Sequence, residues 1–111
     1  SGETLRERRI RQLQRYLQAA EVYAVYQPSS GCFVLPEFSA SLAAQVLVRV
    51  GEEAPVPTST AIDPPVLCVC VPVLSASTPD SALHRAHAKL LEVLRTYEPC
   101  DLKDGVNMVH L

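Results

Sequence analysis

Hydrophobic residues recur at three- and four-residue intervals near the start of the chain, and this pattern predicts an amphipathic helix over residues 4–21. Its apolar stripe contains Ile10, Leu13, Tyr16, Leu17 and Ala20, and the same spacing continues to Ala24. Thr4 and Glu7 have the spacing of a capping box, in which each side chain bonds to the backbone of the other residue. We therefore expect the helix to begin at about Thr4 and to carry its arginines on the side opposite the stripe.

Aromatic and β-branched residues replace this pattern after the helix and predict short strands. Residues 22–26 and 32–35 form two such runs, joined by a turn that contains Pro28 and Gly31. A third strand is expected over residues 45–51, where apolar residues alternate. Val46, Val48 and Val50 share one face of it, and Gln45, Leu47 and Arg49 share the other. Residues 39–44 fit either a strand or a helical turn.

Residues 66–74 form the most apolar strand candidate in the chain, because both of its faces are hydrophobic. One face holds Leu67, Val69, Val71 and Val73, and the other holds Val66, Cys68, Cys70 and Leu74. Such a strand is covered on two sides, either by helices of its own chain or by a partner. The preceding stretch, residues 52–65, contains four prolines and predicts an ordered or semi-rigid loop.

A second helix is predicted over residues 79–97. Thr78, Pro79 and Asp80 suit its N-cap, its first position and the positive end of its dipole, and Pro99 ends it. The tail, residues 98–111, turns at Asp104-Gly105 and then offers an edge strand or a docking segment over Val106–Leu111.

This order of elements predicts one α+β domain over residues 1–111. We expect two layers, with an antiparallel sheet of about four strands within residues 22–74 and the N-terminal and C-terminal helices packed on it. The chain begins Ser-Gly-Glu and its only methionine is Met108, so we expect a domain excised from a longer protein. Residues 1–3 are then interpreted as a cloning scar and a helix cap.

Charge is distributed unevenly along the chain. Half of its ten basic residues lie in the first helix, as Arg6, Arg8, Arg9, Arg11 and Arg15. The net charge is only −2, so any attraction to nucleic acid or to an anionic membrane must be local to that helix. Glu3, Glu7 and Glu21 dilute the cluster and no aromatic residues alternate with the arginines. This composition favours a solvated outer face, or the end of a coiled coil, over a phosphate-binding surface.

Two pairs of residues carry the ligand types that zinc prefers. Cys68 and Cys70 share a strand face, and His84 and His87 share a side of the second helix. Their spacing fits no zinc finger, knuckle or ribbon. We therefore interpret the cysteines as free core residues, His84 as a surface residue and His87 as partly buried.

No nucleophile motif surrounds Cys32 or Cys100, the cysteines expected to be most exposed. The sequence therefore predicts no catalytic, cofactor-binding or metal-binding residues, and a protein that is not an enzyme. The longest apolar run, Pro64–Leu74, is far shorter than the roughly 20 residues that span a bilayer. Unpaired core cysteines favour a reducing cytoplasmic or nuclear location.

The order of elements, together with the prolines of Asp63-Pro64-Pro65-Val66-Leu67 before the predicted fourth strand, resembles the RWD-type domains. These are catalytically inactive relatives of ubiquitin-conjugating enzymes. The resemblance covers about residues 4–97, and the family's Tyr-Pro-x-x-x-Pro sequence is absent. It implies a non-catalytic interaction module that is often paired. A kinase-associated lipid-binding domain has a similar order and would place the arginine helix on anionic lipid.

The sequence thus predicts a protein-interaction or assembly domain of a larger intracellular scaffold or complex subunit, which binds another protein or a second copy of itself. The expected contact residues are Leu13 and Leu17 of the first helix and Val106, Met108 and Val109 of the tail, with Arg8, Arg9 and Arg11 as a charged rim. The alternative is a charge-driven module that binds anionic lipid or nucleic acid through the arginine helix.

Overall fold

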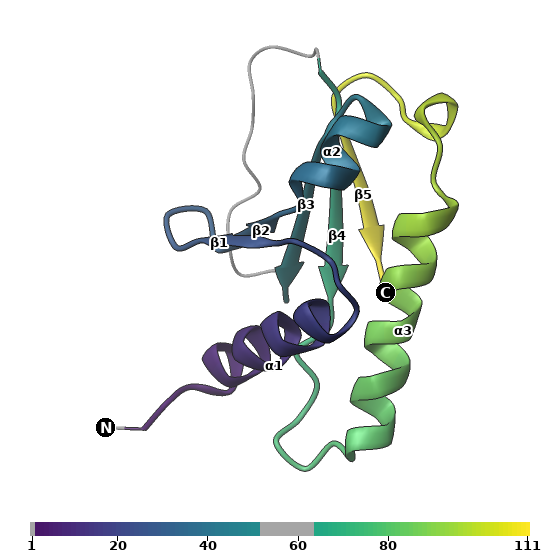
Figure 1. Ribbon diagram of the computed structural model, residues 1–111. Coiled ribbons are helices and arrows are strands. Elements are labelled where there is room, and N and C mark those ends of the chain that lie inside the picture. The colour runs from purple at the N-terminus through teal and green to yellow at the C-terminus, as the bar shows by residue number, and fades with distance from the viewer. Residues whose placement is uncertain (1, 52–63) are drawn as a thin grey trace.

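The computed structural model describes residues 2–51 and 64–111, which form a mixed sheet and the helices packed on it (Figure 1). In chain order the elements are α1 (Leu5–Ala19), β1 (Val25–Gln27), β2 (Cys32–Val34), α2 (Pro36–Leu42), β3 (Gln45–Val50), β4 (Val66–Val71), α3 (Asp80–Thr96), the 3₁₀ turn η1 (Pro99–Asp101) and β5 (Val106–His110). The α+β class is as predicted. Of the predicted proline-rich loop, residues 52–63 lie outside the described residues.

The sheet has five strands in the order β1-β2-β3-β4-β5, with β4 between β3 and β5. The prediction of an antiparallel sheet of about four strands is correct only for β1–β2 and β2–β3, because β3–β4 and β4–β5 pair in parallel. Parallel neighbours need a connection of about a dozen residues or more. Residues 51–65 and the segment that contains α3 provide such connections, so the second half of the chain is a parallel unit.

One face of the sheet carries the main hydrophobic core, and residues of all three α-helices contribute to it. Its strand residues include Phe33, Val46, Val48, Leu67 and Val69, and its helix residues include Leu13, Leu17, Leu42, Leu90 and Leu94. All six residues of β4 are buried, as predicted from its apolar faces. In Figure 1, α2 crosses the upper part of β3 and β4, α1 lies near the arrowheads of these strands, and α3 runs alongside β5.

The second face holds a separate cluster formed by Cys32, Leu47, Val66, Cys68 and Cys70, with the buried Arg49 on the same face. No helix within the described ranges contributes to this cluster. Large apolar side chains become exposed at its two borders, as Val25 on β1 and as Val106 and Met108 on β5. The two faces of β4 are therefore covered in different ways.

Two local structures concern the helix ends. Of the two alternatives left open for residues 39–44, the structure has the helical one: residues 36–42 form a helix because Pro36 stands in its first turn, and Ala43, with φ of 50°, ends it in the left-handed region. Thr78 is not the N-cap of α3, since Pro79 occupies that position and the Thr78 hydroxyl accepts a hydrogen bond from the Ser75 amide.

The burial of β4 makes a strong prediction for Val69, which has no exposed surface. We expect Val69→Asp to abolish cooperative unfolding, because it places an unpaired charge in the apolar core. The matched control is Val25→Asp on β1, where the side chain is 42% exposed. Thermal melts followed by circular dichroism check both variants, and a Val69→Asp melt close to that of the parent would contradict this position for β4.

Candidate functional site

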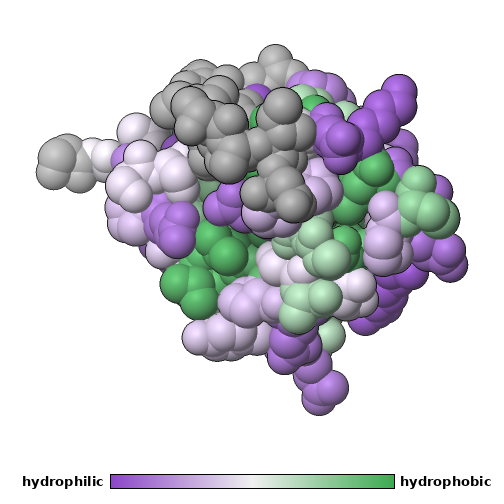
Figure 2. Space-filling view, turned by 90° about the horizontal axis from the view of Figure 1, so that it is seen from above, coloured by the Kyte–Doolittle hydropathy of each residue, from purple (hydrophilic) through white to green (hydrophobic). Residues whose placement is uncertain are grey.

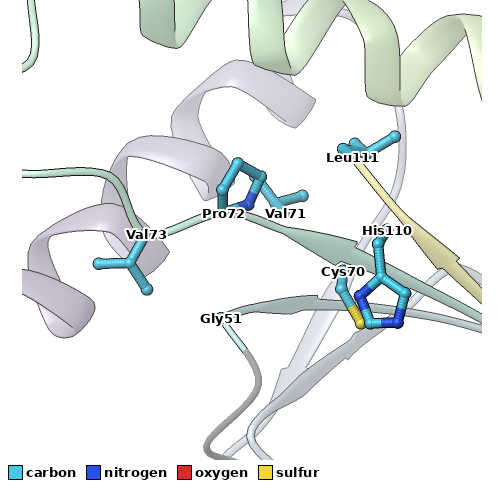
Figure 3. Close-up of a pocket in the computed structure, with 7 residues that line it drawn as sticks. All are labelled: Gly51, Cys70, Val71, Pro72, Val73, His110 and Leu111. Carbon is cyan, nitrogen blue, oxygen red and sulfur yellow. The ribbon is translucent and has the colours of Figure 1, made fainter.

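A cavity of about 390 Å³ lies at the carboxyl ends of the three parallel strands (Figure 3). It is lined by Gly51, Cys70, Val71, Pro72, Val73, His110 and Leu111. These residues end β3, β4 and β5 or follow them directly, so the parallel pairing gathers them at one edge of the sheet. In open sheets with parallel strands this edge is where ligands commonly bind.

Among the residues that line this cavity, Cys70 has the surroundings that bear most directly on chemical reactivity. The strand register aligns Cys32, Arg49, Cys70 and His110 in one row across β2, β3, β4 and β5. Arg49 Nε lies 3.2 Å from Cys70 Sγ and donates a hydrogen bond to it. Figure 3 shows the Cys70 sulfur and the His110 imidazole on the same side of the sheet. The thiol therefore has a guanidinium on one side and an imidazole on the other.

Burial disfavours ionisation of the two neighbouring thiols, Cys68 and Cys32. Burial, with a smaller contribution from the neighbouring Cys70, raises the pKa of Cys68 to about 12. Burial also raises the pKa of Cys32, although Arg49 opposes this effect. Burial lowers the pKa of Arg49, but the hydrogen bond and charge of Cys70 outweigh it, so the net shift is upward. Arg49 thus stays cationic beside these thiols.

The cavity wall is fixed by a close backbone approach and by an arginine from α1. Gly51 has φ of +75°, and a Cβ atom there would lie 2.8 Å from Val73 Cγ2, so no larger residue fits without a shift. Leu74 also has a positive φ, of 63°. Arg9 Nε donates to the Val73 carbonyl at 2.9 Å, and its Nη2 donates to the Ser75 carbonyl. Arg9 therefore holds the segment after β4, which includes the cavity residue Val73.

The prediction that all the arginines of α1 share an outer face is wrong for Arg9, which is 6% exposed. Arg6 is also engaged, since it donates to the carbonyls of Val50 and Gly31. Both residues satisfy carbonyl groups at or beside strand ends, and this explains their inward orientation. Arg8 and Arg11 are exposed, and Arg11 pairs with Glu3 at 2.7 Å.

The remaining predicted contact residues also separate into two groups. Leu13 and Leu17 are buried in the main core, so a partner has no access to them and their assignment as contact residues is corrected. Val109 packs against the same core from β5. Val106 and Met108 point to the second face and are 41% and 38% exposed. They are the predicted apolar contact residues that the structure leaves accessible.

The four predicted zinc-type ligands do not come together. Cys68 and Cys70 belong to the second face, whereas His87 is buried between α3 and α1, and His84 is exposed beside it. Within residues 2–51 and 64–111 no group of three or more His, Cys, Asp or Glu side chains has the arrangement of a metal site. Cys100 is exposed as expected, but Cys32 is fully buried, contrary to the prediction.

A second cavity, of about 320 Å³, lies between α1 and α3. Tyr16 packs here on both histidines, with ring centroids 5.9 Å from His84 and 4.5 Å from His87. Burial lowers the pKa of His87, with smaller effects from His84 and Arg9. His87 is thus a neutral packing residue of the helix interface.

No family model, curated protein or solved structure matches this chain. Among the helices that the structure describes, none is both long and apolar enough to cross a bilayer.

The pairing of Cys70 with His110 was missed by the sequence analysis. Alternation places both residues on one face of their strands, which was a usable signal. Their alignment depends on the pairing and register of β5 with β4, however, and the sequence prediction placed the sheet within residues 22–74 and assigned the tail no neighbouring strand.

The contacts of Arg9 predict that Arg9→Ala lowers the free energy of unfolding by about 3 kcal/mol, because it leaves two carbonyl groups without their charged donor. The exposed Arg8 is the matched control, and Arg8→Ala should change stability by less than about 0.5 kcal/mol. Urea unfolding measures both values. Equal effects of the two substitutions would show that Arg9 is not a structural residue.

The lowered pKa of His87 predicts a loss of stability in mild acid. Above pH about 6.5 the residue is neutral in both states. As the pH falls below that value the unfolded chain binds a proton while the folded state resists it, so the free energy of unfolding declines until the folded-state pKa is passed. Unfolding between pH 7 and pH 5 should show a smaller decline for His87→Gln than for the parent. An identical pH dependence of parent and variant would contradict the assignment.

Proposed function

We propose that this chain is a non-catalytic protein-assembly domain that associates by adding a strand to the outer edge of β5. The observation that carries the proposal is the position of β5 as the last strand of the sheet, with two exposed apolar side chains. Residues 106–111 contain no Asp, Glu, Lys, Arg or Pro. Natural edge strands commonly use such residues to prevent pairing, so their absence suits an edge that is meant to pair.

The ladder geometry supports the same surface. The Gly105 carbonyl accepts from the Val66 amide and the Leu111 amide donates to the Cys70 carbonyl, so the odd-numbered residues of β5 bond to β4. In a strand with parallel pairing, one residue directs both its N–H and its C=O to the neighbour on one side, and the next residue directs both to the other side. The backbone N–H and C=O groups of Val106 and Met108 therefore point to the outer edge.

The distribution of hydrophobic residues on the surface also favours association by strand addition over association through a broad apolar interface. On the face seen from above in Figure 2, hydrophobic residues reach the surface in separate patches among hydrophilic ones. A large flat hydrophobic contact would need a continuous patch. Strand addition instead draws its affinity from backbone hydrogen bonds and needs only a few apolar side chains.

The partner strand that fits this edge is β5 of a second copy. In an antiparallel pair about a two-fold axis, Met108 lies opposite Met108 of the other copy and the two residues exchange two backbone hydrogen bonds. Because the edge carries no formal charge, two identical strands approach without like-charge repulsion. A dimer of this kind agrees with the pairing that an RWD-type kinship would imply, and that kinship remains a prediction.

The cellular setting belongs to the same proposal. We place the domain within a larger scaffold or complex subunit in a reducing cytoplasmic or nuclear compartment. The four cysteines are free thiols, which supports a reducing environment. The alternative, charge-driven binding through α1, has less support because Arg6 and Arg9 are occupied within the fold and Arg11 pairs with Glu3.

Strand addition predicts a concentration-dependent dimer that Met108→Pro disrupts. The Met108 N–H points outward, so proline there removes no hydrogen bond to β4 but blocks one to a partner strand. Size-exclusion chromatography with light scattering should show a dimer for the parent and a monomer with a near-parental melting temperature for Met108→Pro.

Val109→Pro is the matched control, because the Val109 N–H faces β4 and its loss should destabilise the fold itself. Val25→Lys on the opposite border should leave the dimer intact. A parent chain that stays monomeric at high concentration, or a dimer that Met108→Pro leaves unchanged, would contradict the proposal. Binding to anionic vesicles that is lost in Arg8→Glu/Arg15→Glu and at high salt would favour the charge-driven alternative.

A further inference from the structure

The row of Cys32, Arg49, Cys70 and His110 suggests a chemical property that strand addition does not use. The row runs across the second face and ends at the cavity. Of its two cysteines only Cys70 lines that cavity. Its side chain combines contact with a cavity, a charged hydrogen-bond donor and an adjacent imidazole, so it differs from an ordinary buried cysteine.

We propose that Cys70 is a nucleophilic thiol that reacts with small soft electrophiles, preferably anionic ones, that enter the cavity at the carboxyl ends of β3, β4 and β5. Arg49 stabilises the negative sulfur through its Nε–H, and the His110 imidazole accepts the proton that the thiol releases. The proposal is independent of strand addition at β5, because it concerns the end of the sheet and not its edge.

Arg49 is suited to this role because its side chain is only 5% exposed and its Nε lies 3.2 Å from the sulfur. A charge-assisted hydrogen bond in partly desolvated surroundings favours the thiolate, which is the reactive form of cysteine. The other two members of the thiol cluster lack this combination. Burial raises the pKa of Cys68 to about 12 and also raises that of Cys32, and neither residue lines the cavity.

The reaction with iodoacetate illustrates the step. The Cys70 S–H proton moves to a ring nitrogen of His110, the sulfur lone pair forms a bond to the CH₂ carbon, and the carbon–iodine bond breaks to release iodide. The carboxylate of the reagent is attracted by the Arg49 guanidinium. No disulfide competes between Cys32 and Cys70, since β3 separates the two strands that carry them.

Cys100 provides an internal reference in the opposite electrostatic setting. It is exposed, and its sulfur lies 3.9 Å from the Glu98 carboxylate. An anionic reagent should be repelled there and attracted at Cys70. The ratio of the iodoacetate rate to the iodoacetamide rate should therefore be roughly fivefold higher at Cys70 than at Cys100 at low ionic strength.

The test is a time course of alkylation of the folded chain at pH 7, with each cysteine quantified by peptide mass spectrometry. We expect Cys70 to react at least roughly tenfold faster than Cys68 and Cys32, at a rate proportional to reagent concentration. His110→Gln should slow Cys70 by roughly tenfold without changing Cys100 or the melting temperature. His84→Gln, which alters an exposed histidine on α3, should have no effect on Cys70.

Four results would overturn the proposal. The first is a Cys70 alkylation rate no greater than that of Cys68, and the second is a Cys70 rate independent of reagent concentration, which would indicate that global unfolding limits the reaction. The third is the same ratio of iodoacetate rate to iodoacetamide rate at Cys70 and at Cys100. The fourth is a Cys70 alkylation rate that His110→Gln leaves unchanged. Each readout is specific to one residue, so a general loss of fold, which would expose every thiol together, is distinguishable from a local effect.

Discussion

The burial of β4 on both faces is the constraint on which the rest of the structure depends. A strand with six buried residues in succession needs hydrogen-bonded neighbours on both edges and covered surfaces on both sides. Its neighbours β3 and β5 are both parallel to it, and parallel pairing requires long connections. The segment with α3 provides one of them and at the same time covers the main core.

The cavity is a consequence of this parallel unit. Since β3, β4 and β5 end at the same edge, the residues that follow them come together there without being close in the sequence. Arg9 of α1 then fixes the segment after β4 through two carbonyl groups. A helix whose arginines are predicted from the sequence to form a solvated surface thus contributes to the shape of the site.

Local patterns predicted much of the fold because local interactions determine it. The capping box at Thr4 and Glu7, the division of the β3 residues between two faces of the sheet and the two apolar faces of β4 all hold in the structure. Strand direction did not follow from these patterns, because it depends on connections and on pairing between distant segments. The inward orientation of Arg9 was hidden for a similar reason, as its carbonyl partners lie 64 and 66 residues away in the chain.

The site could be predicted only in part. Val106 and Met108 were identified from an apolar tail, and the structure leaves them exposed on β5. Leu13 and Leu17 were identified from the same kind of signal, but the helix buries that stripe against the sheet. Apolar periodicity shows which residues seek cover, and it does not show whether the cover comes from the chain itself or from a partner.

Residue-resolved amide hydrogen exchange of β5 tests the central claim most directly, because it reports both which amides of the strand face β4 and whether the outer edge is used. The account predicts slow exchange at Asn107 and Val109 at all protein concentrations, since these amides face β4. It predicts that exchange at Val106 and Met108 is fast in dilute protein and slows as concentration rises. Uniform exchange along the strand, or protection of Val106 and Met108 that does not depend on concentration, would contradict it.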